Sequence, residues 1–144
     1  MSSLPPKLAE FLEDLSFFPD RADRIQVLIS TSDRFQDVPP EIAERPFDES
    51  HRVSGCESEA FVWCRKTDGK CEFLFAVENP QGLSAKAMAV ILKEGLDGST
   101  PEEVATIQED LPNQIFGAEL SMGKSMGLSG MVRLVKQLAQ QPPA

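Results

Sequence analysis

Residues 59–78 read EAFVWCRKTDGKCEFLFAVE and predict a β-hairpin. The dipeptide at its centre, Asp68-Gly69, is typical of a two-residue turn between antiparallel strands. If Thr67 faces Lys70 across that turn, one face of the hairpin carries the pairs Ala60–Val77, Val62–Phe75 and Cys64–Phe73. The opposite face carries Phe61, Trp63, Leu74 and Ala76. Because both faces are apolar, we expect both to be covered by other parts of the chain.

A cysteine that follows a glycine stands just before the hairpin, in the segment HRVSGCES. Gly55 allows backbone angles that other residues avoid, so Cys56 can stand at a turn with its sulfur presented outward. A thiol is a nucleophile only as the thiolate, and nearby cations favour that form. Arg52 and His51, the chain's one histidine, can supply such charge. The residues alone leave two interpretations open: a nucleophilic loop thiol, or a small buried apolar side chain.

The length of 144 residues predicts a single domain over residues 1–144. The net charge of −9 repels phosphate backbones, so we expect no nucleic-acid partner. No apolar run approaches the ~20 residues needed to span a bilayer, and the N-terminal residues lack a signal-peptide pattern. We therefore expect a cytoplasmic protein without membrane contact. Three cysteines in such a compartment do not predict a disulfide framework.

Helical periodicity and capping residues surround the hairpin on both sides. They predict helices over residues 5–15, about 19–31, 83–94, about 100–107 and about 126–140. Residues 108–124 are predicted to be irregular, with a helical turn near Asn113. The sequence therefore predicts an α+β fold, in which a small antiparallel sheet packs against several helices.

A long segment, residues 36–52, has no periodicity and contains three prolines. Loops of this length inside a compact domain are usually functional or disordered. Since it leads directly to Cys56, we expect it to be functional, with a helical turn near Glu41-Ile42-Ala43.

The remaining chemistry-bearing residues give weaker signals. The cysteines at 56, 64 and 71 form no C-x-x-C pair, and one histidine gives no multi-histidine site, so we expect neither a bound metal nor a cofactor. Cys64, between apolar partners in a strand, is expected to be structural, and Cys71, opposite Lys66, to be a surface thiol. Two other classes stay open: a cluster scaffold that uses Cys64 or Cys71 with Cys56, and a small cysteine-dependent enzyme with His51 as its base.

The segment Val53-Ser54-Gly55-Cys56-Glu57-Ser58 resembles the V-x-G-C-x-S segment of the SufE sulfur-acceptor family. The order of elements around it is similar to that family over nearly the whole chain. The resemblance implies a fold like that of the IscU scaffold. It also implies that Cys56 accepts sulfane sulfur as a persulfide from a PLP-dependent, SufS-like cysteine desulfurase, which it stimulates. The sulfur would then pass to a SufBCD-like cluster assembly complex, so the protein would be a sulfur carrier rather than an enzyme. We expect partner-binding or sulfur-stabilising roles for His51, Arg52, Gly55, Ser58 and Lys124.

Three positions depart from the family pattern. The usual Val-Trp four and five residues after the cysteine is Ala60-Phe61 here, and Val62-Trp63 follows two residues later. The usual Ser-Arg before the last helix is Gly123-Lys124, which keeps the charge but loses the guanidinium fork. Pro80-Gln81-Gly82 replaces the usual Ser-Asp-Ala, which affects the expected partner contacts near Gln81 and not the sulfur chemistry.

A persulfide has to be shielded from reductants and oxidants. We therefore expect Cys56 to rest against an apolar hollow in the free protein and to be released from it when a partner docks.

Overall fold

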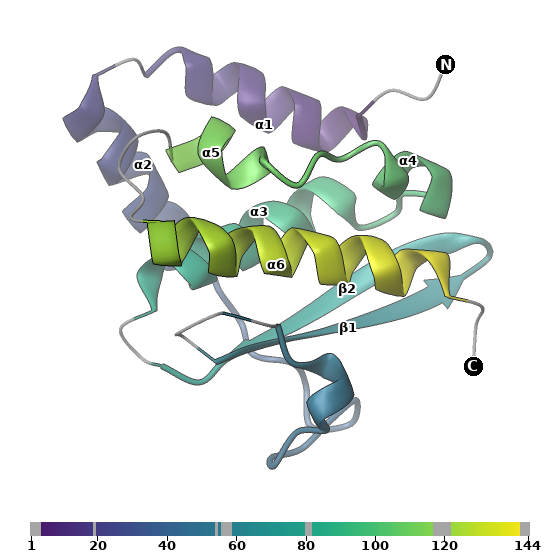
Figure 1. Cartoon of the computed structure of the whole chain (residues 1–144). Helices are drawn as coiled ribbons and strands as arrows, with labels where there is room; N and C mark the ends of the chain where they lie inside the picture. The colour runs from purple at the N-terminus through teal and green to yellow at the C-terminus, as the bar shows by residue number, and fades with distance from the viewer. Residues whose placement is uncertain are drawn as a thin grey trace.

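The computed structural model describes residues 4–18, 20–53, 55, 59–79, 82–116 and 122–141, with 21 and 122–125 described for their backbone alone. In chain order the elements are α1 (Pro6–Ser16), α2 (Arg21–Ser32), the 3₁₀ helix η1 (Glu49–His51), β1 (Ala60–Thr67), β2 (Lys70–Val77), α3 (Leu83–Leu96), α4 (Pro101–Ala105), α5 (Leu111–Phe116) and α6 (Met122–Gln140). The α helices gather on one side of the hairpin, whereas the segment that contains η1 lies on the other side (Figure 1). The α+β prediction is confirmed.

The hairpin has the predicted register. Thr67 pairs with Lys70, and the pairing runs antiparallel to Ala60 opposite Val77. Asp68 and Gly69 have φ angles of 55° and 77°. Positive φ at both central residues is what the favoured two-residue hairpin turn requires, so this dipeptide sets the register of the whole sheet.

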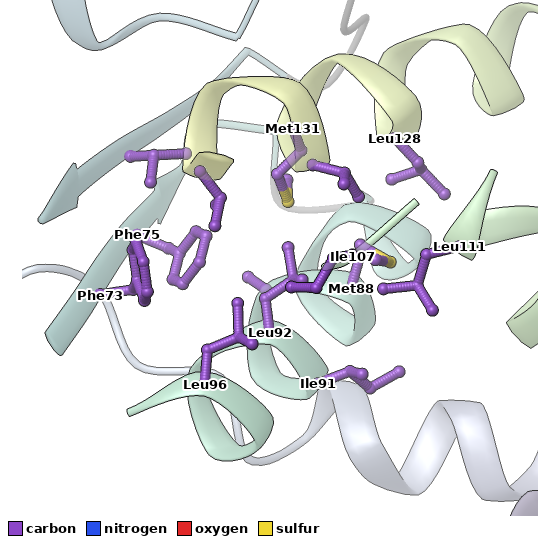
Figure 2. Packing of buried hydrophobic residues seen from close by; sticks show 14 of the residues in the cluster. Phe73, Phe75, Met88, Ile91, Leu92, Leu96, Ile107, Leu111, Leu128 and Met131 are labelled. Carbon is purple, nitrogen blue, oxygen red and sulfur yellow. The ribbon is translucent and has the colours of Figure 1, made fainter. Parts of the chain in front are cut away.

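The main core lies between the hairpin and the helices. Side chains of β2, α3 and α6 point toward one another there (Figure 2), and Phe73, Met88 and Met131 are fully buried. Gly95 of α3 makes the contact with α1 possible, because a Cβ at this position would lie 3.0 Å from the Cβ of Leu8. The two helices can therefore approach closely.

The second face of the hairpin is covered by the long loop. A smaller cluster of Val38, Phe61, Trp63, Leu74 and Ala76 is packed beneath Ile42, Ala43 and Phe47. The helical turn expected near residue 41 is present, since the Ile42 N–H donates to the Pro39 carbonyl at 2.9 Å. The expectation that both faces are covered is confirmed.

The outer edge of β2 is closed by backbone and side-chain partners. The Cys71 N–H donates to the Ser99 carbonyl at 2.7 Å, and the Phe73 N–H donates to Asp97 Oδ1 at 2.9 Å. Lys93 Nζ donates to the Phe73 carbonyl at 2.8 Å, and the Val38 N–H donates to the Phe75 carbonyl, also at 2.8 Å. Capping of this kind prevents an exposed strand edge from pairing with another chain.

The expectation that Cys71 is a surface thiol is wrong, because the residue is only 1% exposed. Its side chain belongs to the same core cluster as Phe73. The Gly98–Ser99 segment forms an isolated antiparallel bridge to Cys71 and lies along the strand edge. Sequence periodicity within the hairpin could not show that a segment beyond the next helix would cover this position.

The helix boundaries differ from the prediction at three places. α3 continues to Leu96, and α6 begins at Met122 despite two glycines in its first two turns. The helical turn expected near Asn113 is present and extends over α5, because Leu111, Ile115 and Phe116 are all buried and the helix packs on α6. For α3 and α5, where Leu96 and Leu111 are buried, tertiary packing outweighs a weak local signal.

Candidate functional site

The base of the loop that contains Cys56 is held against the start of β1. The Val53 N–H donates to the Ala60 carbonyl at 2.9 Å, and Arg52 forms an isolated antiparallel bridge with Phe61. On the other side, the Glu78 N–H donates to the Glu59 carbonyl at 3.1 Å. Both ends of the connection over residues 54–59 are thereby fixed to the sheet.

Two described residues of this connection have left-handed backbone angles. Gly55 has a φ of +76° and Glu59 a φ of 53°. The expectation that Gly55 uses its conformational freedom is confirmed, and nothing lies within 4 Å of a Cβ built on it. Cys56 and Ser58 lie outside the described residues, so the expected apolar hollow around Cys56 and the role of Ser58 stay predictions.

The N-termini of α3 and α6 lie at the same end of the sheet as this loop. α3 begins at Leu83, soon after the end of β2 at Val77. At the opposite end, Lys66 near the hairpin turn donates to the carbonyl of Gln141, beyond the C-terminus of α6, so α6 runs along the sheet toward the turn (Figure 1). The N-terminal ends of helices carry partial positive charge, which favours an anion such as a thiolate or persulfide nearby.

Large apolar side chains are exposed near the N-termini of both helices. Leu83 of α3 is 51% exposed, and Met126 of α6 is 65% exposed. The sequence analysis did not single out either residue. The available signal was that each is a large apolar residue that precedes the buried stripe of its helix.

His51 is held against β1 by two contacts. Its Nδ1 lies 2.8 Å from the carbonyl oxygen of Val62, and its ring stacks on Trp63 with centroids 5.2 Å apart. Because a carbonyl can only accept, Nδ1 carries the proton in this hydrogen bond. The described contacts of His51 therefore position η1 on the sheet.

Arg52 is paired rather than free. Its Nε donates to Glu49 Oε2 at 2.6 Å, and its guanidinium lies 4.8 Å from the centroid of the Phe61 ring. The hydrogen bond with Glu49 raises the pKa of Arg52 further above its already high usual value, and Glu59 and Glu78 act in the same direction through their charge. The carboxylate of Glu49 thus partly offsets the positive charge of Arg52, which weakens any effect of that charge on Cys56.

Arg45 links the long loop to the end of β2. Its Nε donates to Glu78 at 2.9 Å, and its second nitrogen, Nη2, donates to Asp37 at 3.2 Å. Arg45 and Arg52, both near the base of the Cys56 loop, are therefore ion-paired. The backbone of Lys124 belongs to the first turn of α6, but its side chain is not described, and Gln81 lies outside the described residues.

The other two cysteines are reduced and inside the hairpin. Cys64 is partly buried and Cys71 is buried. Burial is the main cause that raises the pKa of Cys64, to about 12, and burial also raises the pKa of Cys71. Neither is a ready nucleophile near neutral pH. Within the described part of the chain, no group of three His, Cys, Asp or Glu side chains could hold a metal ion.

Comparisons with known proteins agree with this architecture. The family model described as "Fe-S metabolism associated domain" (SufE) matches residues 9–139. A solved structure, the solution structure of a hypothetical protein from Thermus thermophilus, matches with a TM-score of 0.76 and 26% sequence identity, over 96% of each chain. A search of curated proteins found no significant match. None of the helices in the described ranges is both long and apolar enough to span a bilayer. The matched family model covers most of the chain, and the chain therefore belongs to the SufE family of proteins associated with iron–sulfur metabolism.

Proposed function

We propose that Cys56 accepts sulfane sulfur as a persulfide from a PLP-dependent, SufS-like cysteine desulfurase, stimulates that enzyme, and delivers the sulfur to a SufBCD-like cluster assembly complex. Membership of the SufE family is the observation that carries this proposal. The protein acts in the cytoplasm as a carrier with a covalent intermediate, and it needs no cofactor of its own.

The transfer is a thiol exchange. The Cys56 thiolate attacks the outer sulfur of the desulfurase persulfide, and a new S–S bond forms between that sulfur and Cys56. The S–S bond to the desulfurase cysteine breaks, and that cysteine leaves as a thiolate. One sulfur atom moves, the number of S–S bonds is unchanged, and no external oxidant or reductant is required.

The geometry at the loop base supports this role. Val53 and Glu59 are tied to the sheet by hydrogen bonds of 2.9 and 3.1 Å, so the connection between them has fixed ends. A cysteine on such a connection can be presented to another protein's active site while the sheet keeps its orientation. The N-termini of α3 and α6 lie at this end of the molecule and would favour an anionic sulfur brought close to them.

A surface for the desulfurase is available around the loop. The exposed apolar side chains of Leu83 and Met126 lie in the first turn of α3 and the second turn of α6, the two helices that begin at this end. Exposed apolar side chains rimmed by polar residues are typical of protein contact sites. His51, Arg52, Ser58 and Lys124 are the proposed polar contacts of the same partner.

The scaffold alternative is less well supported. Cys71 pairs with Lys66, six residues along the strand from Ala60, which places it about 20 Å from the base of the loop at ~3.3 Å per residue. Metal–sulfur bonds are only ~2.3 Å long, so a cluster shared by Cys71 and Cys56 would require the connection that contains Cys56 to fold back along the strand.

Sulfide release by a cysteine desulfurase tests the proposal. We expect wild-type protein to stimulate release, Cys56→Ser to abolish the stimulation, and Cys64→Ala or Cys71→Ser to retain most of it. Circular dichroism on each variant controls for folding. Full stimulation by folded Cys56→Ser would contradict the proposal.

A further inference from the structure

Cys64 and Cys71 lie side by side on one face of the hairpin. Cys64 faces Phe73 and Cys71 faces Lys66, so the cysteines occupy diagonal positions two residues apart along the strands. Because side chains alternate between faces, both thiols point to the helix-covered side. The two side chains are close enough to form a hydrogen bond with each other.

The hydrogen-bond pattern explains this closeness. The Cys71 N–H points away from β1, toward the Ser99 carbonyl at 2.7 Å. The Lys66–Cys71 and Cys64–Phe73 pairs are therefore of the type without direct ladder hydrogen bonds, in which side chains approach more closely. The rigid strands hold the two sulfurs together without any ligand.

We propose that Cys64 and Cys71 form a two-thiolate binding site for a soft, monovalent metal ion, Cu(I). Thiolates are the ligands that select Cu(I), and two sulfur donors are enough for a linear site. A disulfide fits these positions poorly, because diagonal Cα atoms in a sheet lie about 7–8 Å apart, at or beyond the limit for an S–S bridge.

Charged side chains of both signs lie near the two thiols. Binding replaces the two S–H protons, which pass to solvent, with two S–Cu bonds. The neutral dithiol and Cu(I) thereby become a complex with one negative charge. Lys66 is near both thiols and offsets this charge, while Asp97, near both, and Glu102, near Cys71, act in the opposite direction.

A metal ion can reach the two thiols from the side of Cys64. Cys71 is 1% exposed, whereas Cys64 is partly exposed, so an ion would first meet Cys64 and then Cys71. The site lies toward the hairpin turn, away from the loop base at Ala60. No step of sulfur transfer involves it, and the inference does not depend on the proposed function.

The test uses the full-length Cys56→Ser protein, so that the third thiol cannot contribute. Under anaerobic, reducing conditions the protein competes with bicinchoninate for Cu(I). We expect one Cu(I) per chain and a rise in thermal midpoint on loading, because a ligand that binds only the folded state stabilises it. Adding either Cys64→Ser or Cys71→Ser should weaken binding by at least about a hundredfold, beyond the loss usual for a merely supporting residue.

Two further measurements keep the inference falsifiable. Bound Cu(I) should slow alkylation of both thiols in the parent protein, a change that a purely structural role would not produce. Zn(II), which prefers four ligands, should not be retained at one ion per chain. Cu(I) binding that survives in a folded variant lacking both Cys64 and Cys71, or Zn(II) binding as tight as Cu(I) binding, would overturn the assignment.

Discussion

The backbone N–H of Val53 donates to the carbonyl of Ala60 at 2.9 Å, which joins the two ends of the connection that contains Cys56. Val53 is also 2% exposed and part of the main core. The loop that contains Cys56 is therefore anchored by a residue that also packs in the main core.

Gly55→Ala should impair sulfur transfer beyond its effect on stability. Gly55 has a φ of +76°, and an L-residue at such an angle costs about 1–2 kcal/mol. Gly69→Ala is a matched control, because Gly69 has a φ of +77° and equally open surroundings but lies in the hairpin turn. Both variants should lose similar unfolding free energy in urea titrations, whereas only Gly55→Ala should reduce desulfurase stimulation. Equal stimulation by the two variants would remove any special role of the Gly55 backbone.

The exposed apolar residues near the loop should contribute to docking. We expect Leu83→Ser and Met126→Ser to raise the protein concentration needed for half-maximal desulfurase stimulation, with changes in stability within about 0.5 kcal/mol, as is usual for surface positions. Phe17→Ser is the control, because Phe17 is 73% exposed at the end of α1 and belongs to neither helix N-terminus. A titration in which all three variants behave alike would show that this surface does not contact the enzyme.

Arg52→Ala and Lys124→Ala should also raise the protein concentration needed for half-maximal desulfurase stimulation, without preventing folding. The Arg52–Glu49 pair is exposed to solvent, so its loss should change the stability little. If Arg52 steers docking, Glu49→Gln should leave the positive charge of Arg52 unpaired and lower the concentration needed for half-maximal stimulation. Added salt should then reduce the differences among the variants. Unchanged sulfide-release curves at low and high ionic strength would leave these residues as ordinary surface charges.

The buried thiol of Cys64 should make the protein sensitive to alkali. Burial raises the pKa of Cys64 from 9.0 to about 12, so the folded state keeps the thiol neutral at a pH where the unfolded chain ionises it. The unfolded chain therefore gains stability relative to the folded state as the pH rises from about 9 toward 12. Urea midpoints measured from about pH 8 to 11 should fall less steeply for Cys64→Val than for wild type. Parallel curves would show that another group controls alkaline unfolding.

The hairpin could be predicted from the sequence because its determinants are local. Asp68-Gly69 sets the turn, and the alternation of side chains then fixes which residues share a face, as the pairing of Cys64 with Phe73 shows. The capping box at Thr100 and Glu103 could also be predicted from the sequence, because both of its reciprocal hydrogen bonds lie within four residues.

Features that depend on the path of the loops and on distant contacts could not be predicted. The burial of Cys71 results from the Gly98–Ser99 segment, and the pairing of Arg52 with Glu49 results from the path of η1. Periodicity reports which face a residue occupies but not which segment covers it. The proximity of Cys64 and Cys71 was implicit in the predicted register, yet it became evident only from their side-chain contact.

The central claim is that Cys56 alone receives the sulfur. The most direct measurement is peptide mapping by mass spectrometry after incubation with a cysteine desulfurase, PLP and cysteine, followed by rapid alkylation of persulfides. We predict a single added sulfur atom on the peptide that contains Cys56, with none on the peptides that contain Cys64 and Cys71. A sulfur adduct on Cys64 or Cys71, or equal labelling of Cys56→Ser and wild-type protein, would contradict the account.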